Sequence, residues 1–367
     1  MINSITLENF RGFKSFQTDV KPITLFGGKN NSGKTSILEA VMFLFAHNDP
    51  NCFFQMNFLR HMNDQPLLTP ERLWGALFYN FDTNRQLKIL LQNNDGSTNR
   101  LTLKKDDTST SLNIDNAESI KKSFVQMGGI NANYPLLFQY ASRNVKEDGR
   151  YIINNNGVSI KHNYQKAFQE PVWTPVYMFK SETMFDANFI AQWFGQLTLD
   201  DRKKYIIEAL KAFDKAIVDV QTIVKGIIGY LYVIMEDGRK IPLAYMGDGI
   251  NRLLIVLLGI LSNPNSIILI DEIENGFHYS MYEKIWKMLG QAAIENNCQI
   301  IANTHSKDMI HGAVEGLKEA DLQDKFSYIR LGKIDDKVQA HVFDMNLVDY
   351  ALNSEMEVRQ WLIISSK

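Results

Sequence analysis

The segment 28–35, with the sequence GKNNSGKT, combines glycines, small polar residues and a lysine at the spacing GxxxxGK[ST]. A buried-strand pattern at 23–26 precedes it and an apolar helical pattern at 37–45 follows it, so backbone N–H groups and the helix start should converge on an anion. This order predicts a phosphate-binding loop, against the alternative of a glycine-rich surface turn with a stray lysine. The residues expected to hold a nucleotide are Gly28, Asn30, Asn31, Ser32, Gly33, Lys34, Thr35 and Ser36. Lys34 should reach the outer phosphates, and Thr35 should be a ligand of Mg²⁺.

A second group of residues is suited to phosphoryl transfer. Residues 266–272 read SIILIDE, a short buried strand that ends in two carboxylates. Because side chains alternate along a strand, Asp271 and Glu272 should point to opposite sides. Phosphoryl transfer needs a metal ligand and a group that polarises the attacking water. We therefore assign Mg²⁺ to Asp271 and the catalytic base to Glu272, although adjacent acids at a strand end are also common by chance.

A third buried-strand pattern at 299–302 ends at Asn303, Thr304, His305 and Ser306. His305 is expected to contact the terminal phosphate, as a third catalytic residue beside Lys34 and Glu272. A histidine after a strand is more often structural. The assignment of His305 therefore depends on the loop and the acidic pair.

The elements that must position these residues follow from periodicity and turn residues. Short apolar runs at 74–91 and 101–114 predict antiparallel strands, and the Asn-Gly pair at 156–157 and the Asp-Gly pair at 237–238 predict hairpins. Between 199 and 224, apolar residues recur at steps of three and four, which predicts one amphipathic helix packed against a lobe. This pattern is too short for the long coiled-coil arms of chromosome-organising ATPases.

Composition limits the class of protein. The chain has 367 residues, 45% of them apolar and 22% charged, which is typical of a folded globular protein. A net charge of −2 excludes a global basic field, so any contact with nucleic acid must use a local patch. The two cysteines exclude a disulfide scaffold and a cysteine-based zinc site. With no secretory signal pattern and no apolar run of the roughly 18 residues that span a bilayer, we expect a cytoplasmic protein with no membrane contact.

Taken in order, these motifs resemble those of an ABC-type ATPase head of the OLD-like group, a P-loop ATPase family related to chromosome-maintenance and repair ATPases. The resemblance covers most of the chain: ITLENFRGF at the start, GKNNSGKT, residues 176–182, GDGINRLL, SIILIDEIENGFHYS, IIANTHS, and the stretch from FSYIRL to MEVR. It implies ATP and Mg²⁺ as cofactors and hydrolysis of ATP to ADP and phosphate.

In this family a glycine-rich signature precedes the acidic strand and approaches the nucleotide of a second subunit. The resemblance assigns that role to Gly247, Asp248 and Gly249, where a predicted helix at 250–261 would offer its positive end to phosphate. The serine of many signatures is absent here, and Asp248 is an awkward neighbour for phosphate. The alternative is that Asp248 caps the helix.

Other positions are implied by the resemblance alone. Arg11 resembles a residue that lines the nucleotide pocket, with a solvated arginine near a turn as the alternative. Glu274, Asn275 and His278 would form the loop between subunits. The glutamine that links nucleotide to the lobe has three candidates: Gln65, Gln86 and Gln92.

The expected fold is therefore α/β, a single P-loop head of the ABC-ATPase type with an antiparallel β lobe and a helical lobe. The nucleotide-binding core should comprise 1–47 and 230–367, the β lobe about 70–165 and the helical lobe about 185–228. The stretch after His305 is shorter than a typical domain, so no fused nuclease is expected. Asp335 and Asp336 lie in KIDDK, which is read as a tight turn between two strands at 326–331 and 338–343, so these acids and Asp344 are not expected to form a nuclease metal site.

The resemblance predicts that ATP joins two heads into a homodimer, or a higher homo-oligomer, and that hydrolysis separates them. It favours a sensor or regulatory subunit of a bacterial antiviral defence system, which controls a separately encoded nuclease or toxin effector. One alternative is a repair or maintenance ATPase that binds DNA through basic pairs such as Lys104-Lys105, Lys121-Lys122, Arg202 to Lys204 and Arg239-Lys240. Another is a nucleotide-gated scaffold that does not hydrolyse ATP.

Overall fold

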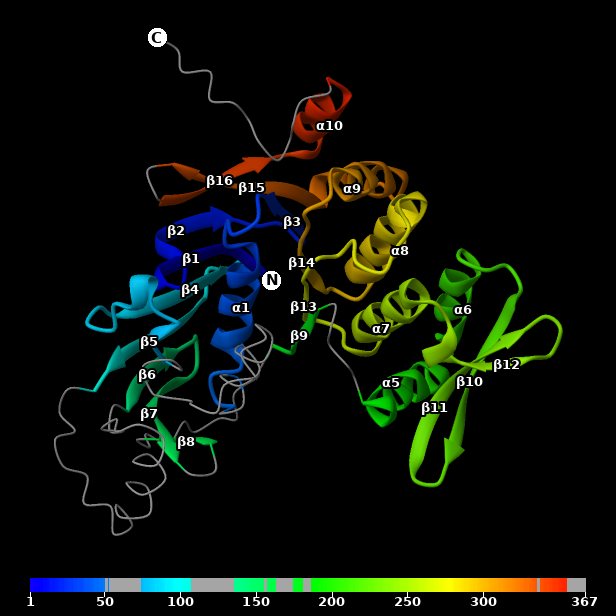
Figure 1. The fold of residues 1–367 in the computed structure, drawn as a ribbon, viewed down its shortest axis with the longest axis horizontal. Coiled ribbons are helices and arrows are strands. Elements are labelled where there is room, and N and C mark those ends of the chain that lie inside the picture. The colour runs from blue at the N-terminus through cyan, green and yellow to red at the C-terminus, as the bar shows by residue number, and fades with distance from the viewer. Residues whose placement is uncertain are drawn as a thin grey trace.

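A computed structural model describes residues 1–49, 52, 74–106, 135–154, 157–162, 174–180, 186–334 and 337–354. Its central sheet has the strand order β16-β15-β3-β14-β13-β9 (Figure 1). All neighbours in this sheet pair in parallel except β15 and β16. The strands are β3 (Ile23–Gly28), β9 (Val176–Phe179), β13 (Ile267–Ile270), β14 (Gln299–Asn303), β15 (Phe326–Ile334) and β16 (Lys337–Phe343). Since β9, β13, β14 and β3 run in the same direction, their carboxyl ends lie along one edge.

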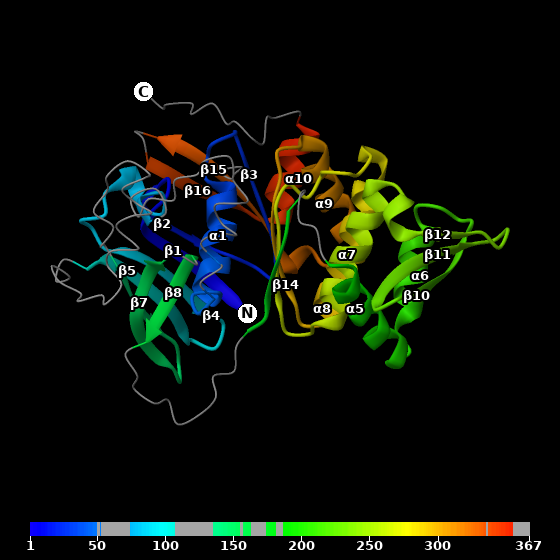
Figure 2. The same ribbon diagram turned by 60° about the horizontal axis from the view of Figure 1, so that its bottom comes forward.

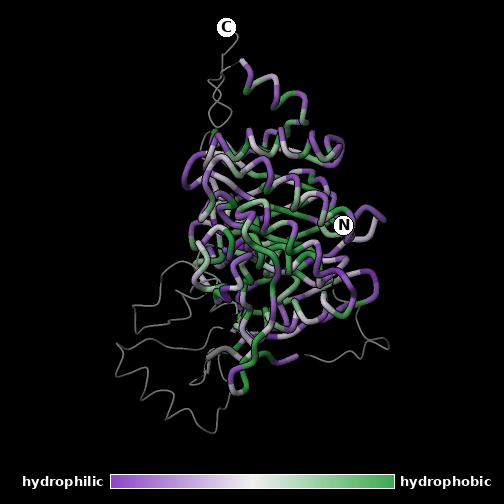
Figure 3. The backbone as a smooth tube through the Cα atoms, turned by 90° about the vertical axis from the view of Figure 1, so that its right-hand side faces the viewer, coloured by the Kyte–Doolittle hydropathy of each residue, from purple (hydrophilic) through white to green (hydrophobic). Residues whose placement is uncertain are grey.

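Helices cover both faces of the central sheet (Figure 2). The helix that follows the phosphate loop, α1 (Lys34–Phe45), lies on one face. The other face carries α7 (Asp248–Ser262), α8 (Tyr282–Glu295), α9 (Lys307–Glu319) and α10 (Met345–Asn353). Because successive side chains of β3 point to opposite faces of the sheet, the strand contributes to the packing on both faces. Ile23 and Leu25 pack with the helices α7 to α9, whereas Phe26 packs with α1. Figure 3 shows the apolar chain concentrated in this interior.

A separate antiparallel sheet covers the outer side of α1, with the order β2-β1-β4-β5-β6-β7-β8. Its strands are β1 (Ile2–Phe10), β2 (Phe13–Asp19), β4 (Leu87–Asn93), β5 (Thr98–Lys105), β6 (Leu136–Ala141), β7 (Lys146–Asn154) and β8 (Gly157–His162). The predicted hairpin is confirmed in its strands, because β7 and β8 pair antiparallel with Asn154 opposite Gly157, while Asn155 and Asn156 lie outside the described residues. The prediction for 74–91 is wrong in its first half, where the short 3-10 helix η2 (Tyr79–Phe81) precedes β4. Residues 107–114 of the second predicted run lie outside the described residues.

A lobe beyond α7 combines two helices with a three-stranded sheet. The helices are α5 (Ala187–Leu199) and α6 (Lys203–Lys211), and the strands are β10 (Ile217–Lys225), β11 (Ile228–Met235) and β12 (Lys240–Pro242). The hairpin predicted at 237–238 is confirmed. The short 3-10 helices η3 (Leu243–Tyr245), η4 (Tyr279–Met281) and η5 (Gln323–Lys325) complete the described elements.

The single amphipathic helix predicted between 199 and 224 is confirmed only at α6, where Ile206 and Leu210 are buried, and is wrong beyond it. The chain leaves α6 at Lys211 and continues as strand β10, which pairs with β11. The register of this pair shifts between Ile217 and Asp219, as at a β-bulge. A bulge inserts one residue, so Ile217 and Val220, three positions apart, are both buried and imitate the spacing of a helix. Among the described residues, no helix is long and apolar enough to cross a membrane.

Candidate active site

The predicted phosphate loop connects β3 to α1. Gly28 has φ of +140° and Gly33 has φ of +96°, conformations that glycine adopts without strain. Both positions are also crowded: a Cβ on Gly28 would lie 2.5 Å from the carbonyl oxygen of Leu331, and one on Gly33 would lie 2.6 Å from the ring of Phe13. The two glycines therefore permit the loop to fold tightly against β15 and β2.

Lys34 lies within the curve of the loop. Its Nζ donates hydrogen bonds of 2.9 Å to the carbonyl oxygens of Gly28 and Lys29, and lies 3.3 Å from Nδ1 of His305. Burial lowers the pKa of Lys34 from 10.5 to about 8, against the opposing effect of nearby carboxylates, of which Glu274 has the largest. The ammonium is thus held by backbone oxygens at the place where phosphate oxygens are expected.

The acidic pair follows β13 directly, beside the loop. Oγ1 of Thr35 donates a hydrogen bond of 2.9 Å to Oδ1 of Asp271. The side chain of Asn303, at the end of β14, contacts both acids: its Nδ2 donates to Oδ1 of Asp271, and its Oδ1 accepts a bond of 2.8 Å from the amide of Glu272. Glu272 has φ of +49°, an uncommon conformation for a non-glycine residue. Asn303 therefore fixes the backbone turn that separates the two carboxylates.

His305 lies between Lys34 and Glu272. Its Nε2 is 3.9 Å from Oε1 of Glu272, and its backbone amide donates a bond of 2.7 Å to Oε1 of Glu274. Burial, and secondarily the Lys34 ammonium, lower the pKa of His305 below its ordinary value. A neutral ring that accepts from Lys34 at Nδ1 carries its proton on Nε2, which is a donor for phosphate or water.

The residues present fit a magnesium ion bound together with nucleotide. Mg²⁺ commonly uses one or two carboxylates, phosphate oxygens and waters. Thr35 and Asp271 supply a hydroxyl and a carboxylate at the edge of the loop. In the part of the chain that the structure describes, no cluster of three or more His, Cys, Asp or Glu side chains could hold an ion without nucleotide.

The predicted signature residues lie at the start of α7. Gly247 is the N-cap, with no other heavy atom within 4 Å of the position of a Cβ, and Asp248 is the first helical residue rather than the cap. Gly249 is small for a different reason than expected, because a Cβ there would lie 2.7 Å from the carbonyl oxygen of Gly276. Gly249 thus permits α7 to pack closely against the loop that follows Glu272.

Arg11 is buried beneath α1. Its Nε forms an ion pair of 2.9 Å with Oε2 of Glu39, and Nζ of Lys180 lies 3.7 Å from Oε1 of the same carboxylate. Arg11 is therefore buried in an ion pair rather than solvated near a turn. Glu39 joins the β1–β2 turn, the loop helix and the end of β9.

Of the three glutamines considered as the link between nucleotide and lobe, the two that the structure describes lie in or beside the β lobe. Gln92 accepts a bond of 3.4 Å from Oγ of Ser4 within the β lobe, Gln86 is exposed just before β4, and Gln65 lies outside the described residues. The edge strand of the central sheet, beside β13, is β9, and the residue that follows it is Lys180 rather than a glutamine.

Sequence reasoning missed two residues that contact the acidic pair. Asn303 was visible only as part of a polar run after a strand. Arg252 was visible only as a residue of the helix that begins at Asp248, and its Nη2 donates bonds of 2.8 and 3.0 Å to the carbonyl oxygens of Asp271 and Glu272. Both act through bonds between segments distant in sequence, which no local pattern reveals.

Known proteins resemble the chain over almost its whole length. A Helicobacter pylori protein described as "ATP/GTP phosphatase" is 20% identical over 381 residues, which span 97% of this chain and 99% of that protein. A solved Smc head bound to the C-winged helix domain of ScpA has a TM-score of 0.51 and 11% identity, covering 94% of this chain and 98% of that chain. A second Smc head, with an extended coiled coil and bound to the C-terminal domain of ScpA derived from Pyrococcus furiosus, has a TM-score of 0.50 and 9% identity, covering 96% and 99%.

These structural likenesses show that the fold is that of an ABC-type ATPase head. The matched family model begins at β3 and extends through the phosphate loop, the acidic strand and His305. Because residues 23–308 match the model of the family described as "AAA domain, putative AbiEii toxin, Type IV TA system", the chain belongs to this family of P-loop ATPases.

Proposed function

We propose that the chain is an ATP-controlled switch, in which two ATP-bound copies associate head to tail and hydrolysis separates them. The start of α7 carries this proposal. Gly247 is exposed, no side chain caps the helix, and the first-turn N–H groups favour an anion. A terminal phosphate on a second copy would satisfy these donors. Association of two copies would therefore supply acceptors for the N–H groups at the start of α7.

In this proposal, each residue of the site has a separate role in hydrolysis. Glu272 accepts a proton from the attacking water, while the Nε2–H of His305 donates to the terminal phosphate. Lys34 exchanges its backbone acceptors for phosphate oxygens, and the backbone of Gly247 to Gly249 on the second copy adds donors. When bound through Thr35 and Asp271, Mg²⁺ neutralises charge on the phosphates.

We propose further that this switch belongs to the OLD-like group and serves a bacterial antiviral defence system, as the subunit that controls a separately encoded nuclease or toxin. Two observations support this role. The family description names a toxin of a toxin–antitoxin system. The Smc heads of similar fold were solved with a bound protein, ScpA. Co-expression with the product of the neighbouring gene would test it, with an ATP-dependent complex as the expected result and no complex in any nucleotide state as the contrary one.

Three of the basic residues considered for DNA binding have partners within the protein. Nζ of Lys203 lies 2.6 Å from Oδ1 of Asp219, and Nε of Arg239 lies 2.5 Å from Oδ2 of Asp237. Arg202 donates bonds of 3.0 and 2.6 Å to Leu261 and Asn296. Lys121 and Lys122 lie outside the described residues. On the contacts of the other three, we propose the switch without a DNA-binding role.

Replacing Glu272 with Gln tests the dimer. The variant should bind ATP, hydrolyse it about 10²-fold more slowly because the base is lost, and remain dimeric in ATP during light scattering after size exclusion. Glu236→Gln, an exposed change in the β11–β12 turn, is the matched control and should behave as the unaltered protein does. A Glu272→Gln protein that stays monomeric in ATP would overturn the dimer, and one with the normal rate would overturn the assignment of the base.

A further inference from the structure

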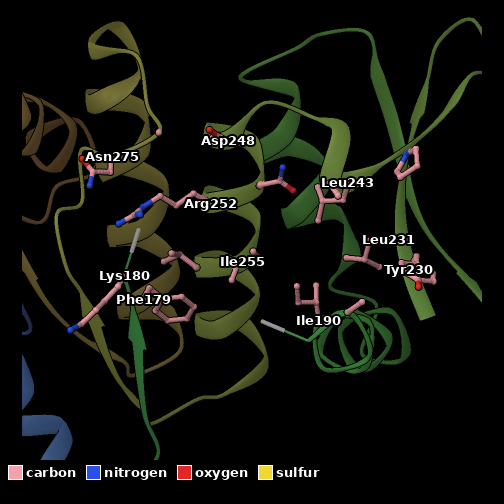
Figure 4. Close-up of a pocket in the computed structure, with 16 residues that line it drawn as sticks. Phe179, Lys180, Ile190, Tyr230, Leu231, Leu243, Asp248, Arg252, Ile255 and Asn275 are labelled. Atoms are coloured by element: carbon pink, nitrogen blue, oxygen red, sulfur yellow. The ribbon is translucent and has the colours of Figure 1, made fainter. Parts of the chain in front are cut away.

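A cavity of about 750 Å³ lies between α7 and the lobe (Figure 4). Phe179 at the end of β9, Ile190 of α5 and Ile255 of α7 line it, and Leu231 and Leu243 face them from the lobe. Its size lies within the range of roughly 300–1,000 Å³ that is typical of small-molecule sites. An apolar ligand body would be well matched to these walls.

Arg252 gives the cavity a polar end. Its Nη2 is engaged by the carbonyl oxygens of Asp271 and Glu272. Its Nε is buried and has no hydrogen-bond partner among the described residues. Burial lowers the pKa of Arg252, although the carboxylates of Glu274, Asp271 and Glu272 oppose this effect. No carboxylate in the described ranges lies within 4.0 Å of the guanidinium, so a buried donor remains for a ligand acceptor.

The same cavity also borders the catalytic base. Asn275 lines it, and the Nδ2 of Asn275 donates a bond of 2.6 Å to Oε2 of Glu272. Two lining residues, Arg252 and Asn275, are thus bonded directly to the acidic pair. A ligand that draws either side chain toward itself changes the position of Glu272.

We propose that this cavity is a regulatory site for a small apolar molecule with one anionic head, a carboxylate or a phosphate, which pairs with Arg252 and slows ATP hydrolysis. A guanidinium binds either head through two parallel hydrogen bonds, and more strongly where water is excluded. The pairing competes with the bonds from Arg252 to the carbonyls of Asp271 and Glu272. The proposal rests on hydrolysis at the acidic pair and does not require the dimer.

Decanoate, decyl phosphate and the neutral 1-decanol are the probes, added to the nucleotide-free protein in isothermal titration calorimetry. One of the two anionic probes should bind at least about tenfold more tightly than the alcohol, since a charge-assisted bond contributes about 1.5–3 kcal/mol. Comparison of decanoate with decyl phosphate identifies the head. Equal affinity for all three, or no binding by any, would overturn the proposal.

Ile190→Trp fills the cavity from α5, far from the acidic pair, and should remove probe binding while the ATPase rate without probe is kept. Leu199→Trp, an exposed change on the same helix, is the matched control and should retain binding. In the unaltered protein, a saturating anionic probe should lower the hydrolysis rate by about tenfold. This loss is smaller than the roughly 10²-fold loss of rate that a misplacement of about 1 Å can cause. Inhibition that persists in Ile190→Trp would place the probe elsewhere and overturn the site.

Discussion

Oγ1 of Thr35 donates a hydrogen bond of 2.9 Å to Oδ1 of Asp271, although the two residues are 236 positions apart. The bond joins the first turn of α1 to the end of β13. It therefore places a hydroxyl and a carboxylate where one ion can contact both. We expect Asp271→Asn, which keeps an acceptor for Thr35 but removes the charge, to bind ATP no more tightly with Mg²⁺ than with a chelator.

Hydrolysis by Asp271→Asn should also fall by about 10² or more, the scale of losing one group that stabilises transition-state charge. Thr35→Ser, which keeps the hydroxyl, is the control and should retain the Mg²⁺ dependence of binding. Titration of a fluorescent ATP analogue with and without Mg²⁺ measures both variants. A normal magnesium effect in Asp271→Asn would contradict the assignment of Asp271.

The depressed pKa of Lys34, about 8, predicts how nucleotide affinity depends on pH. Phosphates favour the charged ammonium, so binding raises this pKa and takes up a proton once the free protein is deprotonated. Nucleotide affinity should therefore fall above pH 8, by up to about tenfold per pH unit. Well below pH 8, where Lys34 is charged in both the free and the bound protein, its titration should not change the affinity. Calorimetry in buffers of different ionisation enthalpy measures the proton uptake.

Lys34→Ala should bind nucleotide more weakly and lose the proton uptake above pH 8. Lys29→Ala is a matched control, because Lys29 precedes the same helix but contributes only its backbone oxygen to the Lys34 ammonium. Proton uptake that persists in Lys34→Ala would assign the titration to a different group.

The carboxylate of Glu39 is fully buried between Arg11 and Lys180. Glu39→Gln would remove the buried negative charge that faces both cations, and breaking a buried ion pair typically lowers the free energy of unfolding by about 3–5 kcal/mol. Glu8→Gln, which breaks the exposed pair of Glu8 and Lys88, should change it by at most about 1 kcal/mol. Urea denaturation of both variants tests the difference, and equal midpoints would show that Glu39 is not structural.

Gly247 and Gly249 should differ in their tolerance of a methyl group. Gly249→Ala meets the backbone of Gly276 and should lower stability by about 1–3 kcal/mol, as overpacking does. Gly247→Ala meets open space and should lower it by at most about 1 kcal/mol, the difference between glycine and alanine as an N-cap. Thermal unfolding without nucleotide measures both, and the reverse order would contradict the packing of α7.

Local motifs explain why much of the site could be predicted. The loop, the acidic strand and the strand before His305 are each continuous in sequence, and each keeps its own periodicity. Asn303 and Arg252 could not be assigned in this way, because their partners lie across the sheet or on another element. The error at β10 has a similar origin. Ile217 and Val220 are spaced as on a helix, and they lie on the same face of a strand only because of a bulge that depends on pairing with β11.

The position of β3 between β14 and β15 has a consequence for synthesis of the protein. The strand that leads into the phosphate loop leaves the ribosome long before its two neighbours, which begin only at Gln299 and Phe326. Incomplete chains thus lack the flanks that the loop requires. A product truncated before β14 should be inert toward nucleotide, because neither flanking strand of β3 is present.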